Sequence, residues 1–178
     1  WVQDYASMLP IHLTLNIENA DIIDMCAAPG GKTFQALSQN GNVNIIEKNI
    51  NRASILKENL NRLKFNNKIH ILDALQINDK KKYDIVLLDA PCSSVGTIRR
   101  NPEIFYRKTI PNFPSIIKLQ TELLKKSLKL LKRNGTIIYM VCSFLEEETL
   151  KQINLFLQEN KNFKLDTFTS DDKNIKKI

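Results

Sequence analysis

Short apolar runs and stretches with helical spacing alternate along the chain. Runs typical of buried strands occupy residues 21–25, 43–46, 68–72, 83–88, 136–141 and 163–168. Between them, apolar side chains recur every three or four positions in residues 33–39, 50–65, 115–132 and 146–160, as in amphipathic helices. Strands that alternate with helices in this way predict an α/β fold, with a doubly wound, mostly parallel sheet and right-handed crossovers.

Three further segments complete this prediction. Residues 1–19 open with a short helical pattern, and Asn134-Gly135 is typical of a turn ahead of the fifth strand. Residues 97–114 carry prolines at positions 102, 111 and 114, which interrupt regular structure. We therefore expect a long irregular loop between the fourth strand and the helix that follows it.

The turn between the first strand and the first helix, residues 24–33, is built from small residues. Ala27, Ala28, Gly30 and Gly31 leave almost no side chain there, so a ligand can approach the backbone and meet the amides of the helix start. Doubly wound folds bind ligands at such turns, and we interpret this one as a cofactor cradle. The alternative is a tight strand-to-helix turn that binds nothing.

Polar side chains follow the carboxyl ends of the predicted strands, the edge where doubly wound folds bind ligands. These residues, in chain order, are Cys26, Glu47, Asp73, Asp89, Cys92 and Cys142. Taken singly, each has a simpler interpretation, because acids also cap helices and cysteines are often buried and inert. Their alignment on one edge favours a site, and two cysteines near Asp89 suit nucleophilic catalysis on an electron-poor ring.

Three ligands are possible for the cradle. Two of them contain phosphates, namely the nucleoside triphosphate of a P-loop protein and the nicotinamide dinucleotide of a dehydrogenase. Gly31-Lys32-Thr33 fits the end of a P-loop, with Asp89 as its magnesium carboxylate, but Cys26 stands where the first glycine belongs. Pro29 would also remove an amide donor from the phosphate nest. The G-x-G-x-x-G pattern of a nicotinamide dehydrogenase is absent.

The third interpretation is S-adenosylmethionine, which has no phosphates to bind. It needs room for a methionine moiety, an acid for the ribose and a polar group for the adenine. Glu47 lies roughly 20 residues beyond the first strand, where a dinucleotide fold places its ribose acid. Asp73 follows the next strand, although a helix cap or a solvated strand end remains the alternative for it.

Composition limits the remaining possibilities. The 178 residues suit one domain, and no apolar run approaches the roughly 18 residues that cross a bilayer, so we expect no membrane segment. The net charge of +7 suits a polyanion such as RNA or DNA, or reflects a solvated lysine face. Three cysteines without a CxxC pair, and His12 and His70 without ligand spacing, predict no metal site and a reducing, cytoplasmic setting.

Several spaced motifs resemble those of one enzyme family. Residues 24–33, 89–96 and 139–143, with the opening residues 2–7, are similar to the motifs of the RNA 5-methylcytosine methyltransferases, the Nop/Sun family. The run at 96–104 looks most like that of the bacterial members that modify 16S ribosomal RNA. This resemblance covers residues 2 to about 160 and implies a Rossmann-like class I methyltransferase fold.

The resemblance implies S-adenosylmethionine as the cofactor and RNA as the substrate. The implied cofactor contacts are Cys26, Ala27, Ala28, Pro29, Gly30, Gly31, Lys32, Glu47, Asp73 and Asp89. Arg99, Arg100, Arg107 and Lys108 are plausible RNA contacts, or else belong to a solvated loop. A target base that is methylated in this way must leave its stack, which RNA loops make easy.

The resemblance also assigns the catalytic roles. It makes Cys142 the nucleophile that adds to C6 of cytosine, whereas the Pro-Cys dipeptide, used by DNA cytosine methyltransferases, would have favoured Cys92. Asp89 is then expected to hydrogen-bond the base at N3, and Cys92 to assist proton removal or product release.

The sequence departs from the family pattern in places. Val141 replaces the usual threonine before the nucleophile, and Glu47 is one methylene longer than the usual aspartate. No final strand of the Gly-Phe-Phe kind is evident near the C-terminus. We expect residues 1–178 to form a single, monomeric catalytic domain without a separate RNA-binding domain. An inactive fragment that retains cofactor or RNA binding is the alternative.

Overall fold

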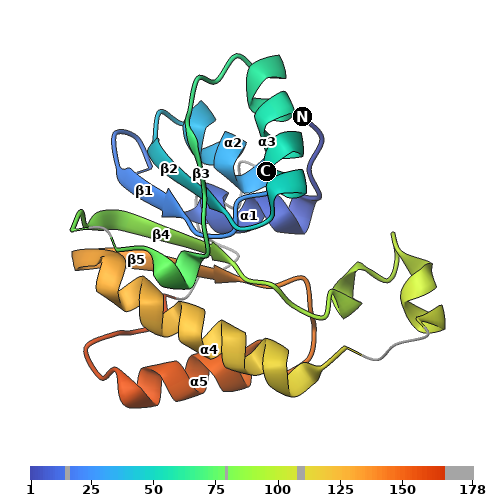
Figure 1. Cartoon of the computed structure of the whole chain (residues 1–178). Helices are drawn as coiled ribbons and strands as arrows, with labels where there is room; N and C mark the ends of the chain where they lie inside the picture. Colours follow the sequence, from blue (N-terminus) through green and yellow to red (C-terminus); the bar gives the residue numbers. More distant parts are fainter. Residues whose placement is uncertain (15–16, 79, 108–110, 167–178) are drawn as a thin grey trace.

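The computed structural model describes residues 1–14, 17–78, 80–107 and 111–166. Its centre is a five-stranded parallel sheet in the order β3-β2-β1-β4-β5, shown in Figure 1. The strands are β1 (Asp21–Asp24), β2 (Asn42–Glu47), β3 (Ile69–Ile71), β4 (Tyr83–Asp89) and β5 (Leu131–Met140). The predicted doubly wound α/β fold is confirmed.

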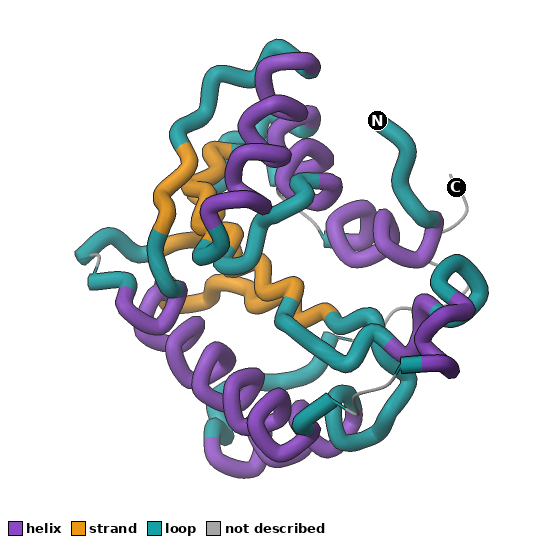
Figure 2. Tube along the Cα trace, turned by 45° about the vertical axis from the view of Figure 1, so that its right-hand side comes forward, coloured by secondary structure: helices purple, strands orange, loops and turns teal. Residues whose placement is uncertain are grey.

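Helices cover both faces of the sheet, as Figures 1 and 2 show. One face carries α1 (Tyr5–Leu13), α2 (Gly31–Ser38) and α3 (Ile50–Arg62), and the other carries α4 (Phe113–Leu130) and α5 (Leu150–Glu159). Short 3₁₀ turns, η1 (Ala74–Gln76), η2 (Val95–Thr97) and η3 (Pro102–Tyr106), lie in the connections. No helix among the described residues is long and apolar enough to span a membrane.

The core has two halves because neighbouring strand residues point to opposite faces. Ile22 and Leu87 pack with Leu56 and other residues of the α1–α3 side. Ile23 and Val86 pack in a second cluster with Leu123, Leu124 and Leu130 of α4. The central strands are therefore apolar on both faces, which explains why they appear in the sequence as continuous apolar runs.

Several element boundaries differ from the prediction, and α5, for example, begins at Leu150 instead of residue 146. Helix α4 begins at Phe113 instead of residue 115, because Asn112 caps it through a hydrogen bond from Ser115 N and Pro114 fits the first turn, where no N–H is needed. Strand β5 begins five residues early, at Leu131. The predicted turn exists as an irregularity inside this strand, where Asn134 has a φ of 62°.

Two predicted segments also need correction. The connection between β4 and α4, which stands away from the sheet in Figure 1, contains η2 and η3 and is not wholly irregular. The predicted strand at 163–168 is wrong for residues 163–166, and its last two residues lie outside the described part. Phe163 instead packs edge to face on Phe156 of α5, with ring centroids 5.5 Å apart, which draws this segment back onto the helix.

Gly30 is the point in the cradle where a side chain is least tolerable. Its φ is 111°, and an added Cβ would lie 2.1 Å from the Phe34 ring and 2.5 Å from Leu56. We predict that Gly30→Ala lowers the free energy of unfolding by on the order of 2 to 4 kcal/mol, combining backbone strain and overpacking. Urea denaturation measures this change.

Gly31→Ala is the matched control. The nearest atom to an added Cβ there is 3.4 Å away on the Gln3 side chain, and residue 31 already lies in helix α2. The control should change the free energy of unfolding by less than about 1 kcal/mol. Equal losses in both variants would contradict the steric account.

Candidate active site

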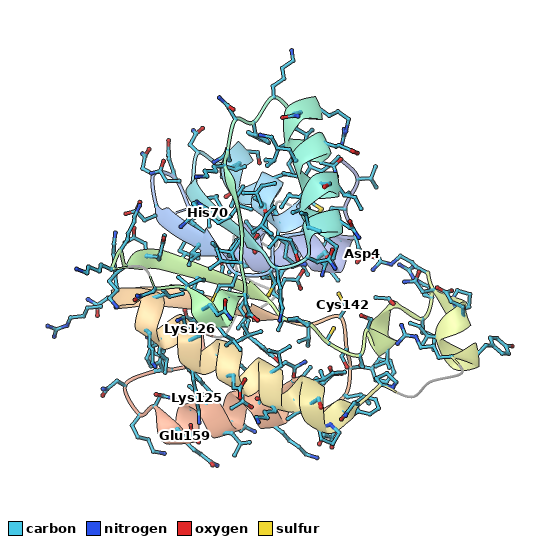
Figure 3. All side chains as sticks on the ribbon, viewed as in Figure 1. Asp4, His70, Lys125, Lys126, Cys142 and Glu159 are labelled. Atoms are coloured by element: carbon cyan, nitrogen blue, oxygen red, sulfur yellow. The ribbon has the colours of Figure 1, made fainter. Side chains whose placement is uncertain are left out.

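The candidate site lies where the strands end. A cavity of about 670 Å³ opens between the start of α1, the end of β5 and the connection after β4. Its chemistry-bearing lining residues are Asp4, Lys32, Asp89, Arg99, Arg100 and Cys142. Figure 3 shows Asp4 and Cys142 at this same end of the molecule. Of the predicted cofactor contacts, Lys32 and Asp89 line this cavity.

The cradle is fastened to the neighbouring strand through its backbone. Ala27 N donates to Ile46 O at 3.0 Å, and Ala28 N donates to Glu47 Oε2 at 3.1 Å. Arg52 of α3 donates to the carbonyl of Ala28. The first helical hydrogen bond of α2 joins Phe34 N to Gly30 O, so the amides of residues 31–33 precede the helical ladder and point toward the ligand edge.

Glu47 lies beside the cradle as predicted, but it is only 4% exposed. Besides Ala28 N, it accepts a hydrogen bond from Asn49 N at 2.8 Å through Oε1. Each carboxylate oxygen therefore keeps one further acceptor position. Glu47 holds the cradle against β2 in this structure, and its role toward a ribose stays a prediction.

The side chains of a P-loop are occupied differently here. Lys32 Nζ forms an ion pair with Asp89 Oδ2 at 2.6 Å. Thr33 Oγ1 donates to Asp24 Oδ2 at 2.6 Å. The lysine and threonine that a P-loop would direct at phosphates and Mg²⁺ are bound to carboxylates of the protein, so the P-loop alternative does not fit the geometry.

Asp73 makes the contacts of a helix cap. Its Oδ1 accepts from Leu75 N at 3.0 Å, at the start of η1, and its Oδ2 lies 2.6 Å from Lys48 Nζ. The Lys48 ammonium lowers the pKa of this carboxyl. The contacts agree with the simpler interpretation of Asp73, and its role toward an adenine stays a prediction.

Cys92 and Cys142 are brought together by the ends of β4 and β5. Cys142 N lies 3.2 Å from Cys92 Sγ, and the two thiols share a hydrogen bond. That bond, with help from Ser94 and the Cys142 amide, lowers the pKa of Cys92 to about 6 against the effect of burial. The same bond, together with burial and Asp89, raises the pKa of Cys142, so the negative charge of the pair lies on Cys92.

Cys26 has the opposite environment. Burial, followed by the charges of Asp24 and Glu47, raises its pKa to about 12. It therefore stays a thiol at neutral pH, and its sulfur is a poor nucleophile.

The predicted RNA-binding arginines divide into two groups. Arg99 and Arg100 line the cavity, with guanidinium nitrogens 3.7 and 3.5 Å from Asp4 Oδ2. Arg107 Nη1 instead donates to Ser93 O at 3.1 Å and so supports the segment that carries Cys92. Lys108 lies outside the described residues.

Two buried carboxylates, Asp24 and Glu148, were not predicted. Asp24 is 1% exposed and lies under the cradle, where it accepts from Thr33 and from Cys26 N. Glu148 is 0% exposed and contacts the segment that follows Cys92. The sequence offers a signal for the burial of Asp24, because this acid ends an apolar strand directly before the cradle. It offers no such signal for Glu148, which belongs to a run of three glutamates.

The sheet order, the cradle after β1 and the two cysteines after β4 and β5, with the likeness to solved methyltransferases, define a Rossmann-like methyltransferase fold. A model of the family described as 16S rRNA methyltransferase RsmB/F matches residues 11–178. The chain belongs to this family.

Individual relatives agree with this assignment. Ribosomal RNA small subunit methyltransferase B of Photorhabdus laumondii is 37% identical over 172 residues, which cover 92% of this chain and 39% of that protein. The solved structure of PH0851 matches with a TM-score of 0.89 and 32% identity, covering 96% of this chain and 40% of that one. NSun6 from Pyrococcus horikoshii with SFG matches with a TM-score of 0.81 and 29% identity, covering 89% and 42%. The chain thus spans about two fifths of the length of these relatives.

Asp24 should make stability depend on pH. Burial, with a contribution from the charge of Asp89, raises its pKa to about 6 although Thr33 donates to it. The folded protein therefore binds a proton that the unfolded chain releases near pH 4, and stability falls as the pH rises from 4 through 6. We predict that wild type loses on the order of 2 to 3 kcal/mol relative to Asp24→Asn between pH 4 and 7, measured by urea unfolding.

Asp21→Asn provides a control of opposite sign. Hydrogen bonds from Lys81 and Lys132 lower the pKa of Asp21, so its contribution is lost as the pH falls below 4. Parallel pH profiles for wild type and Asp24→Asn would contradict the assignment of a raised pKa to Asp24.

Proposed function

We propose that this chain methylates C5 of cytosine in RNA, with 16S ribosomal RNA as the expected substrate, through a covalent bond between Cys142 and C6 of the base. The observation that carries the proposal is that Cys142 lines one cavity with Asp89 and Lys32, while its amide donates to the Cys92 sulfur at 3.2 Å. Membership of the RsmB/F family supports the reaction class, and the relative named above is a small subunit RNA methyltransferase.

S-adenosylmethionine is the methyl donor that we propose. The amides of residues 31–33 precede the helical ladder and suit a carboxylate such as that of the methionine moiety. Glu47 and Asp73, at successive strand ends, suit hydroxyl and amine donors, and residues 26–32 with Asp89 would complete the contacts. NSun6, a structural neighbour, was solved with SFG, an analogue of this cofactor. When bound, the cofactor supplies an electrophilic methyl group.

The thiol pair suggests how the nucleophile is generated. Cys142 Sγ forms a bond to C6 while its proton passes to the Cys92 thiolate, since the two thiols already share a hydrogen bond. Asp89 hydrogen-bonds the base at N3, and Lys32, 2.6 Å from Asp89, offsets the negative charge that develops in the ring. After methylation the C5 proton leaves to a base in the solvent, and the bond from Cys142 to C6 breaks as Cys92 returns the proton to the Cys142 sulfur.

RNA is expected to reach the cavity past Arg99 and Arg100. Both guanidinium groups lie at its rim, where they can exchange the Asp4 carboxylate for a phosphate.

A binding protein without turnover is the second candidate, because the chain spans about two fifths of the length of its relatives. A monomer in the cytoplasm remains our expectation for either candidate.

Methyl transfer and the two cysteine roles are tested together. Tritium from labelled S-adenosylmethionine should enter 16S ribosomal RNA with the wild-type chain. Cys142→Ala should abolish both transfer and covalent capture of RNA. Cys92→Ala should form the adduct more slowly, because solvent must then take the Cys142 proton. The adduct should still accumulate on a denaturing gel, because the proton needed for release is no longer returned.

The possible failures have distinct meanings. Cofactor binding without any transfer by wild type favours the second candidate. An adduct that accumulates in Cys142→Ala and is absent in Cys92→Ala means that the two cysteine roles are exchanged.

Glu47 should contribute to cofactor affinity. Glu47→Ala removes a buried carboxylate that both holds Ala28 and offers acceptors at the cradle. We predict an affinity loss of on the order of 1 to 3 kcal/mol for S-adenosylmethionine by calorimetry, the usual cost of a charged hydrogen bond. Glu58→Ala, an exposed acid on α3, is the control and should bind as wild type does. Unchanged affinity in Glu47→Ala would limit Glu47 to a role in the fold.

A further inference from the structure

Glu148 is a buried acid that the proposed reaction does not use. It lies in the turn between β5 and α5 and is 0% exposed, whereas Glu146 and Glu147 beside it are exposed. Its Oε1 accepts from Ser93 N at 2.8 Å and from Gln120 Nε2 at 3.1 Å, and its Oε2 accepts from Ser93 Oγ. These donors come from the segment after β4 and from α4, so one carboxylate joins three parts of the chain.

The contacts of Glu148 reach both cysteine segments. Ser93 directly follows Cys92, and Ser143 directly follows Cys142. The two serine hydroxyl oxygens lie 3.3 Å apart, and Ser143 also hydrogen-bonds the Glu148 carboxylate. Glu148 therefore bonds the residue that directly follows each cysteine.

The backbone around Glu148 is held as well. Its carbonyl accepts from the Tyr139 hydroxyl at 2.8 Å, so the end of β5 fixes the turn. Gln120 Nε2 also donates to Pro91 O at 3.0 Å, which places the residue before Cys92 under the same support. The segment from Pro91 to Ser93 is thus attached to Glu148 on both sides of Cys92.

The charge of Glu148 is stabilised by neutral donors. Burial opposes ionisation, but hydrogen bonds from Ser143, Ser93 and Gln120 outweigh burial and lower the pKa of the carboxyl. A carboxylate, which only accepts, matches three converging donors better than any neutral side chain does. Removing it would leave those buried donors unsatisfied and free the segments they belong to.

We propose that Glu148 is a positioning residue that sets the spacing of Cys92 and Cys142 for the proton exchange between them. The inference rests on the proposed function for its effect on turnover. Near-attack geometry is sensitive to displacements of about 1 Å, which can cost about 100-fold in rate. Glu148 acts through the serines, whose backbone positions determine where the two sulfurs lie.

The glutamine variant separates the charge from the hydrogen bonds. In Glu148→Gln the amide oxygen can accept from Ser93 N and Gln120, while the amide nitrogen donates to Ser93 Oγ and the Ser93 hydroxyl turns to Ser143. Glu148→Gln therefore keeps the hydrogen bonds with Ser93 and Gln120 but carries no negative charge. Glu148→Ala removes every acceptor, and Glu146→Ala is the exposed control two residues earlier in the same turn.

Turnover is the first readout. With labelled S-adenosylmethionine and 16S ribosomal RNA, Glu148→Ala should lose about 100-fold in kcat while KM for RNA changes less than about threefold. Glu148→Gln should recover most of this loss, and Glu146→Ala should equal wild type. Circular dichroism establishes the folded fraction, by which each kcat is corrected. A kcat for Glu148→Ala that equals wild type after this correction overturns the proposal.

Alkylation of the thiols by iodoacetamide is the second readout and needs no turnover. Cys92 should react in wild type with a pKa near 6, with Asp89, Lys32 and Tyr139 as the other titratable groups around the pair. In Glu148→Ala this pKa should rise toward that of an isolated thiol, because the bond from Cys142 is lost. An unchanged alkylation profile in Glu148→Ala overturns the proposal.

The two readouts keep the inference separate from the proposed function. If wild type transfers no methyl group but its alkylation profile shifts in Glu148→Ala, the proposed function fails and the positioning role stands. If Glu148→Ala does not fold, Ser93→Ala replaces it. Ser93→Ala removes the hydroxyl bridge between Glu148 and Ser143 and should raise the alkylation pKa of Cys92, and no change in that variant overturns the proposal.

Discussion

The parallel pairing of β4 with β5 is the constraint on which the candidate site depends. Asp89 and Met140 are paired at the last position of the two strands, and Ala90 N continues the ladder to Met140 O at 2.9 Å. Farther on, Gly96 N donates to Cys142 O at 3.1 Å, so the segments that follow β4 and β5 stay together beyond the sheet. Because parallel strands end at the same edge, residues fifty positions apart in the sequence meet there.

That edge concentrates negative charge, and its stability depends on how each carboxylate is satisfied. Asp89 is paired with Lys32, while Glu47 accepts backbone amides. Glu148 accepts from a serine, a glutamine and an amide. Asp24 accepts from Thr33 and Cys26 N, but these bonds do not offset its burial, and a raised pKa is the consequence.

The periodicity of the sequence predicted the sheet because its strands are buried on both faces. Pairs such as Ile22 and Ile23 send one side chain to each half of the core, which leaves a continuous apolar run that is easy to recognise. The placement of Glu47 and Asp89 at strand ends followed from the same runs. The strand expected at 163–166 failed because its apolar residues pack back on α5, a contact that periodicity cannot distinguish from pairing.

Glu148 illustrates why part of the site escaped prediction. Three consecutive glutamates before a helix are typical of a solvated first turn, but here donors from residues 93, 120 and 143 accompany the burial of the third one. Such partners are determined by the fold and have no local signal in the sequence. The tolerance of a charge at a buried position therefore depends on segments that folding brings from far along the chain.

The assignment of the nucleophile among the two cysteines also depends on contacts that the fold creates. A Pro-Cys dipeptide favours Cys92 as nucleophile, while the family resemblance favours Cys142. In the structure the hydrogen bonds converge on the Cys92 sulfur, which lowers its pKa, so Cys92 is the thiol that can accept a proton. A nucleophile must give up its proton as it attacks, and a neighbouring thiolate is a suitable acceptor. Under the proposed function, the low pKa of Cys92 thus supports the assignment of Cys142 as the residue that attacks the base.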